Sequence, residues 1–303
     1  MRHYSIKRFI RKITPWSALL PMVLVTLCCY LCATLWSVRI SLSSSRSFPH
    51  YDFVGLSQYQ RLFDNQRWFD SFENLFLFGV VFIAASMLLG FLLAIFIDQK
   101  IRAESLFRTI FLYPYAMSFV ATGLVWQWIL NPENGLQQSV RQLGWSEFVF
   151  DWITTQDKAI YAVAIAAVWQ ASGLVMALML AGLRSIDTEI WHATKIDGIP
   201  PWRVYFFIIL PMLKPTVSTV FLLLATSVVK VFDVVISMTQ GGPGMASDVP
   251  ARFIMDHLFS RANLALASAG AVTLLLMVLM LLIPIWYWRK HQSGKALKAA
   301  VLC

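Results

Sequence analysis

Charged residues are scarce in this sequence. Asp, Glu, Lys and Arg make up 14% of its 303 residues, whereas hydrophobic residues make up 58%. Soluble globular domains contain about 25% charged residues, so this chain has too few charges to cover a water-facing surface of its size. The composition therefore argues against one or two ordinary soluble domains and predicts a protein surrounded by lipid.

Motifs that bind phosphate or perform catalysis are also missing. The sequence contains no Gly-x-x-x-x-Gly-Lys-Ser/Thr phosphate loop and no His-Glu-x-x-His zinc motif. Its apolar runs hold no pair of aspartates for intramembrane proteolysis, and their centres are nearly free of ionisable groups for a proton relay. We therefore expect no catalytic residues, no metal and no bound cofactor, and energy for any transport must come from another subunit.

Cysteine is rare and offers little chemistry. Three of the four cysteines, Cys28, Cys29 and Cys32, lie in the first apolar run, and Cys303 is the last residue. The spacing of Cys29 and Cys32 is formally that of a redox or metal pair. Within an apolar helix, however, this spacing favours small hydrophobic side chains over a functional pair.

Long apolar runs are what the sequence has instead. Six of them reach the ~20 residues that a membrane-spanning helix needs: 16–38, 75–97, 109–130, 159–183, 206–230 and 264–288. We expect an all-α membrane protein with six transmembrane helices. A cytoplasmic segment (1–15) precedes the six-span domain (16–288), and a basic tail (289–303) follows it.

The basic residues indicate how the chain is oriented. With both termini in the cytoplasm, the segments 1–15, 98–108, 184–214 and 289–303 hold 16 of the 25 Lys and Arg residues. Positive residues gather on the cytoplasmic side of short loops, so this orientation is favoured. The net charge of +9 is then a consequence of topology and does not predict nucleic-acid binding.

A short helix is predicted in the cytoplasmic loop at about 184–205. Asp187 is a good N-cap residue, and Glu189 and Lys195 sit where the helix dipole favours their charges. Gly198 suits the left-handed position after the helix, and Pro200–Pro201 prevents continuation. The result is a rigid helix of ~10 residues between two spans, and such a helix can pass force to a docked partner.

This loop resembles the coupling loop of binding-protein-dependent ABC importers. The family pattern is Glu-Ala-Ala, three residues and Gly, followed by an aromatic-x-x-Ile-x-Leu-Pro tail. Asp197 and Gly198 match the Asp-Gly pair, and Ala193 matches the middle of Glu-Ala-Ala. His192 stands where the glutamate belongs, which puts in doubt any ion pair that the glutamate makes to the ATPase. The tail is matched by Tyr205, Ile208, Leu210 and Pro211.

Further segments are similar to the sugar branch of these permeases. They are FVGLSQYQRLF (53–63), LYPYAMSF (112–119) and TQGGPGMAS (239–247), the last resembling an outer loop of the maltose and glycerol-phosphate permeases. The stretch from Trp191 to His257 looks closest to permeases for glucose-like monosaccharides. The resemblance covers about residues 15–290.

The resemblance implies a type I importer fold related to the methionine permease. It implies a second, homologous permease subunit, two ATPase subunits that bind the ATP, and an extracytoplasmic sugar-binding protein, all at the inner membrane. His192, Ala193, Asp197, Gly198, Tyr205 and Pro211 would then serve ATPase coupling.

Candidate solute-path residues are the polar and aromatic side chains within the spans. A sugar site needs ring faces for C–H groups and hydrogen-bonding groups for hydroxyls. Lys230 and Asp233 lie near membrane depth, where we expect them to pair or to face a cavity. For each polar candidate the alternative role is an interhelical hydrogen bond. The candidates are Tyr115, Trp169, Gln170, Ser172, Gly173, Lys230 and Asp233.

Two other functions remain open. A permease of the same class could import glycerol 3-phosphate or another polyol, although an anionic solute would favour arginines in the path, and no span centre has one. A channel or an intramembrane enzyme is the alternative from a different class, and the coupling-loop match argues against it.

Overall fold

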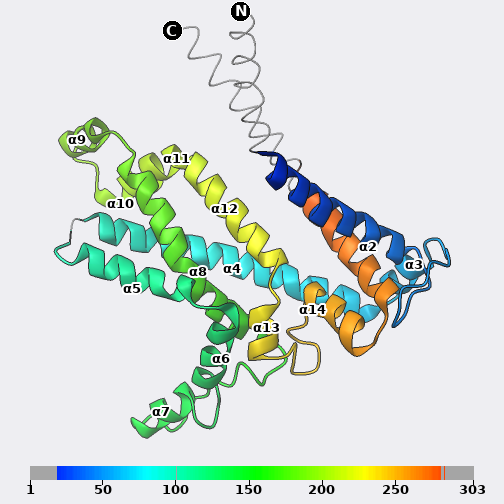
Figure 1. Cartoon of the computed structure of the whole chain (residues 1–303). Helices are drawn as coiled ribbons and strands as arrows, with labels where there is room; N and C mark the ends of the chain where they lie inside the picture. Colours follow the sequence, from blue (N-terminus) through cyan, green and yellow to red (C-terminus); the bar gives the residue numbers. More distant parts are fainter. Residues whose placement is uncertain (1–18, 100, 281–282, 284–303) are drawn as a thin grey trace, which may run out of the picture. The chain divides into compact units, whose positions relative to one another are not determined.

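A computed structural model of the chain describes residues 19–99, 101–280 and 283 (Figure 1). It divides into two units, one made of residues 1–65 with 254–303 and the other of residues 66–253. The segments 1–15 and 289–303, expected to be cytoplasmic, lie outside the described residues.

The unit of residues 66–253 is built on two long helices that pack along each other. These are α4 (Gln66–Asp98) and α8 (Ala159–Arg184) (Figure 1). Small residues let the two backbones approach, because a Cβ atom added at Gly90 would meet Val175 of α8 at 2.5 Å. Close packing through small residues is how membrane helices associate without a hydrophobic drive.

The remaining apolar helices of this unit are broken rather than straight. Helices α5 (Glu104–Ala116) and α6 (Phe119–Ile129) meet at 99°. The Ser118 side chain accepts a hydrogen bond from the Ala121 backbone N–H, so α6 begins as a new capped helix. The sequence did not indicate this break.

The second break lies at two prolines. The segment formed by α10 (Pro201–Arg203), the π-helix η2 (Val204–Ile209) and α11 (Leu210–Met212) meets α12 (Lys214–Val229) at 76°. Pro211 and Pro215 flank the bend, as expected of residues that remove a backbone donor.

Short helices complete this unit. They are α7 (Leu136–Gln142), α9 (Thr188–Ile196), α13 (Asp233–Met238) and the first residues of α14 (Pro250–Met255). Helix α13 packs against α6 and α8, and these contacts place it beside the α5–α6 break.

The other unit contains the two ends of the described chain. A continuous helix, Leu19–Ser41, includes the π-helix η1 (Leu27–Cys32) and α2 (Ala33–Ser41). Helix α3 (Ser57–Phe63), the π-helix η3 (Asp256–Ser260) and the helix Leu264–Met280 also belong here. Cys28, Cys29 and Cys32 are exposed free thiols.

The all-α membrane architecture predicted from the sequence is confirmed, and the count of six spans stays a prediction. Three described helices are long and apolar enough to cross a membrane, or five if each bent pair is one span. The sixth expected span, 264–288, corresponds to the shorter apolar helix Leu264–Met280, because the described part of that region ends there apart from residue 283.

Candidate functional site: a cavity beside a helix break and the short helix α9

A cavity of about 390 Å³ lies beside the α5–α6 break of the larger unit. Residues from α4, α5, α6, α8, α12 and α13 line it. Four of the predicted solute-path residues are brought together there, namely Tyr115, Gln170, Lys230 and Asp233. A concave, largely apolar site with a few polar groups is the usual form of a small-molecule site.

Gln170 connects this cavity to the α5–α6 break. Its side-chain Nε2 donates a hydrogen bond of 2.9 Å to the backbone oxygen of Met117, a carbonyl at the break. Gln170 is only 2% exposed, and its Oε1 has no hydrogen-bond partner among the described residues. The interhelical hydrogen bond is therefore present, and an acceptor oxygen is left over beside the cavity.

Lys230 and Asp233 lie between the end of α12 and the start of α13. Both line the cavity, and the described residues show no ion pair between them. Of the two arrangements expected from the sequence, exposure to a cavity is the one observed. The cavity lining thus includes one basic and one acidic residue among polar and apolar side chains.

Three other predicted residues do not line this cavity. The Trp169 ring packs edge-on against Trp126, with centroids 5.9 Å apart. The Ser172 hydroxyl donates to the Trp169 carbonyl within α8. A Cβ atom at Gly173 would overlap the backbone carbonyl of Phe111, so this glycine permits close approach of α5 to α8. Their observed contacts are packing contacts.

Sequence reasoning also missed residues that line the cavity. Thr226 and Ser227 of α12 are polar residues inside an apolar span, and the rule that selected Gln170 would have found them. Phe78, Phe82 and Phe119 supply aromatic surface, and nothing in the sequence distinguishes them from the other phenylalanines.

Helix α9 (Thr188–Ile196) is the short helix predicted from the sequence in the loop at about 184–205. The Asp187 carboxylate accepts a hydrogen bond from the Glu189 backbone N–H at its start. At its end Gly198 has φ +64°, its N–H bonds the Lys195 carbonyl, and the Ile199 N–H bonds the Thr194 carbonyl. This pair of bonds is the Schellman motif, which needs a residue that tolerates positive φ.

The two sides of α9 have different surroundings. His192 and Lys195 line a second cavity, of about 510 Å³, together with residues from the ends of α4 and α8. Ala193 and Asp197 are exposed, Ile196 is 86% exposed, and a Cβ atom at Gly198 would meet nothing within 4 Å. The end of α9 therefore presents open surface to a partner.

Tyr205 and Pro211, the other two residues predicted to serve coupling, belong to the segment after α9. Tyr205 is 9% exposed within η2, so its side chain is turned away from the surface that α9 presents. Pro211 is an exposed residue of α11, next to the 76° bend. Tyr205 contacts Trp191 and Gln99 of the same chain.

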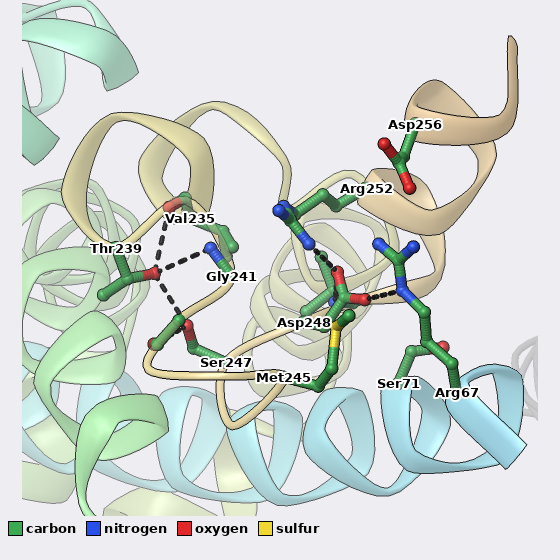
Figure 2. A network of polar contacts seen from close by, with 12 residues as sticks. Arg67, Ser71, Val235, Thr239, Gly241, Met245, Ser247, Asp248, Arg252 and Asp256 are labelled. Carbon is green, nitrogen blue, oxygen red and sulfur yellow. Dashed lines mark hydrogen bonds and ion pairs between the residues drawn. The ribbon is translucent and has the colours of Figure 1, made fainter. Parts of the chain in front are cut away.

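A network of polar contacts holds the loop that follows α13 (Figure 2). The Asp248 carboxylate is fully buried and binds Arg67 Nε at 2.6 Å and Arg252 Nη1 at 3.0 Å. The Asn74 amide donates to the backbone oxygens of Met245 and Asp248. Arg67 and Asn74 of helix α4 thus hold this loop in place.

Steric constraints explain why position 241 of this loop is a glycine. Gly241 has φ +79°, and a Cβ atom there would lie 2.6 Å from the Arg252 guanidinium carbon. The hydroxyl oxygens of Thr239 and Ser247 lie 2.7 Å apart and close the loop across its base (Figure 2). The resulting loop is held from both sides, while Gly244 and Met245 at its tip are exposed.

Residues 86–288 match the family of binding-protein-dependent transport system inner membrane components. A probable ABC transporter permease of Pyrococcus horikoshii is 39% identical over 259 residues, which cover 84% of this chain and 88% of that protein. The chain belongs to this family, and it is the membrane component of such a system. The family assignment agrees with the expectation of a translocation subunit that works with a separate ATPase.

Other similar proteins are named as permeases for different solutes. The xylose/arabinose import permease of Haloferax volcanii is 30% identical over 97% of this chain and 92% of that protein. The sn-glycerol-3-phosphate permease of Pectobacterium atrosepticum is 28% identical over 86% of this chain and 88% of that protein.

The fold also matches a solved structure. A bacterial ABC transporter involved in the import of the acidic polysaccharide alginate has a chain that superposes with a TM-score of 0.81. The alignment covers 95% of this chain and 99% of that chain at 16% identity. This likeness confirms the importer-permease fold.

Proposed function

We propose that this permease imports a neutral sugar and that the 390 Å³ cavity is part of its path. The observation that carries the proposal is Gln170, a residue of the cavity lining whose buried Oε1 has no hydrogen-bond partner among the described residues, next to aromatic rings and hydroxyl side chains of the same lining. A buried acceptor without a partner is costly, and a sugar hydroxyl can supply the missing hydrogen bond. The name of the Haloferax relative supports the same solute class.

The charged residues of the cavity favour a polyhydroxylated solute over a phosphate ester. Phosphate groups are bound most strongly by guanidinium groups, and no arginine is among the residues that line this cavity in the described part of the chain. Lys230 is accompanied by Asp233, whose carboxylate would repel a phosphate but can accept hydrogen bonds from hydroxyls. Glycerol 3-phosphate or a related polyol phosphate is therefore the second candidate.

The assembly proposed for this function contains four further kinds of partner. They are a second homologous permease, two ATPase subunits, an extracytoplasmic sugar-binding protein and the surrounding lipid. The exposed end of α9 would dock on an ATPase, and both chain termini would lie in the cytoplasm. The ATPases would bind the ATP, since this chain has no phosphate loop.

Replacing Gln170 with leucine tests the sugar path. We expect the KM for uptake by the assembled importer to rise about tenfold, which corresponds to the loss of one hydrogen bond to a solute hydroxyl. Assembly with the partner subunits should be unchanged. Uptake of radiolabelled solute, measured with the importer in vesicles, gives the KM, and co-purification of the subunits reports assembly.

Ser172→Ala is the control for this test. It also removes a polar group from α8, but its hydroxyl bonds only the Trp169 carbonyl within the same helix. We expect uptake by Ser172→Ala to match that of the unmodified importer. Normal KM in Gln170→Leu would show that Gln170 serves packing through Met117 and would remove the main support for the proposed path.

Cysteine labelling tests the proposed orientation. In a chain without its own cysteines, Ile196→Cys should react with a membrane-impermeant reagent only in inverted vesicles, and Met245→Cys only in intact cells. Both positions are exposed, at the end of α9 and at the tip of the loop after α13. Reaction of both from the same side, or of each from the opposite side, would contradict the topology.

A further inference from the structure

Tyr205 connects helix α9 to the cytoplasmic end of α4. Its ring packs against Trp191 of α9, with centroids 5.4 Å apart and planes at 60°. Its hydroxyl accepts a hydrogen bond of 2.9 Å from Gln99 Nε2, one residue after the end of α4. Tyr205 therefore contacts both the docking helix and the bundle.

A second link reaches the same end of α4. Arg184, the last residue of α8, lies 3.6 Å from the Asp98 carboxylate and 2.8 Å from the Glu104 carboxylate. Only the three residues Ser185–Asp187 separate Arg184 from the first residue of α9, so the start of α9 is held close to Arg184. Arg184, which precedes α9 in the sequence, thus contacts Asp98, and Tyr205, which follows α9, contacts the next residue, Gln99.

The space between these links is a cavity. It measures about 510 Å³ and is lined by Asp98, Gln99 and Arg184 on one side and by Trp191, His192 and Lys195 of α9 on the other. Helix α9 is consequently not packed continuously against the bundle at this place. Helix α9 is linked to the bundle by its two chain connections, by the packing of Ile190 and Trp191 against the hydrophobic core, and by the side-chain links at Asp98 and Gln99.

Helix α4 also reaches the proposed solute path. Phe78 and Phe82 of α4 line the 390 Å³ cavity. Gln99 follows Phe82 by 17 positions, which corresponds to about 25 Å along a helix. A helix is stiff over this length, so a shift at its cytoplasmic end is transmitted to the cavity wall.

We propose that Tyr205 and Gln99 are positioning residues that transmit movement of α9 to α4 and so to the solute cavity. The proposal rests on the function proposed above. It assigns Tyr205 a role that the coupling motif does not specify: the residue acts inside the chain, between two of its helices, and does not contact the ATPase.

A double-mutant cycle tests this link in the assembled importer. Tyr205→Phe keeps the ring against Trp191 and removes only the hydroxyl, and Gln99→Leu removes the other partner. We expect each variant to lower the number of solute molecules imported per ATP hydrolysed by about two- to fivefold, within the range of one hydrogen bond. The double variant should be no worse than either single variant, because all three lack the same bond.

Tyr59→Phe is the matched control. The Tyr59 hydroxyl also has a hydrogen-bond partner, Ser41 Oγ at 2.8 Å, but it lies in the unit that contains neither α9 nor the cavity. Its transport ratio should equal that of the unmodified importer. Thermal stability and bound ATPase are measured for every variant, since a purely structural role would lower stability without changing the ratio.

Two outcomes would overturn the inference. Unchanged ratios in Tyr205→Phe and Gln99→Leu would show that the bond transmits nothing, and multiplicative losses in the double variant would show that the residues act separately. Gly198→Asp separates these failures from a failure of the proposed function. If Gly198→Asp abolishes import while the Tyr205 and Gln99 variants are normal, docking stands and only the link through α4 is wrong.

Discussion

Replacing Gly198 with aspartate is expected to abolish solute uptake or to detach the ATPase from the permease. Gly198 ends α9 with φ +64° in a Schellman motif. A side chain at this φ costs about 1–2 kcal/mol within the chain itself. That cost is too small to unfold the unit, so the main effect must come from what approaches the residue in the complex.

The surroundings of Gly198 define that effect. A Cβ atom at this position would meet nothing within 4 Å in the chain, so the space above the glycine is free for a partner. An aspartate would occupy this space and place a charge next to Asp197. Uptake by vesicles and co-purification of the ATPase measure the two expected losses.

Gly55→Asp is a control with nearly the same backbone strain. Gly55 has φ +62°, and a Cβ atom there would also meet nothing within 4 Å, but it precedes α3 and is remote in sequence from the coupling loop. We expect uptake to persist in Gly55→Asp. His192→Glu, which restores the family residue, should also be tolerated. If the Gly198→Asp importer takes up solute normally with its ATPase still bound, this end of α9 does not dock on the ATPase.

The docking helix could be predicted from sequence because its signals are local. An aspartate at the N-cap, a glycine after the last turn and two prolines determine where α9 begins and ends within about a dozen residues. The bend at Pro211 and Pro215 was predictable for the same reason. The 99° break between α5 and α6 was not, because it depends partly on Gln170 of α8 binding the Met117 carbonyl.

The solute cavity could be predicted only in part, and helix geometry explains which part. Successive residues of an α-helix point about 100° apart, so the five residues 169–173 surround α8 and cannot share one face. The cavity is lined by Ala167, Gln170, Ala171 and Leu174, which follow the spacing of a single helix face. Polarity within the span identified Gln170 correctly as a cavity residue, whereas Trp169, Ser172 and Gly173 point elsewhere.

Contacts between distant parts of the sequence were beyond prediction. Asp248 binds Arg67, 181 positions earlier, and Gln99 binds Tyr205, 106 positions later. Arg67, Gln99 and Asp248 belong to polar segments, where a charge or an amide is expected to face water. Only the packing of the helices shows that they meet.

Replacing Asp248 with alanine is expected to destabilise the larger unit by about 3–5 kcal/mol, the cost of breaking a buried ion pair by removing one of its members. Asp248 is fully buried, and the side chain of Arg67 is only 10% exposed. Removing the carboxylate would leave the Arg67 and Arg252 guanidinium groups facing each other across its site (Figure 2). The measurement is thermal unfolding of the purified importer in detergent, where a clear decrease in Tm is expected.

Two further variants show whether the charge of Asp248 is the cause. Asp248→Asn keeps the size of the side chain and one acceptor oxygen, which can still bind the Val249 N–H. A loss of stability close to that of the alanine variant would therefore assign the effect to the charge. Asp70→Ala removes a carboxylate of the same helix, α4, whose bond to Gln66 is exposed, and it should cost less than about 1 kcal/mol. If Asp248→Asn unfolds at the same temperature as the unmodified importer, the loop is held by its backbone hydrogen bonds and not by the two arginines.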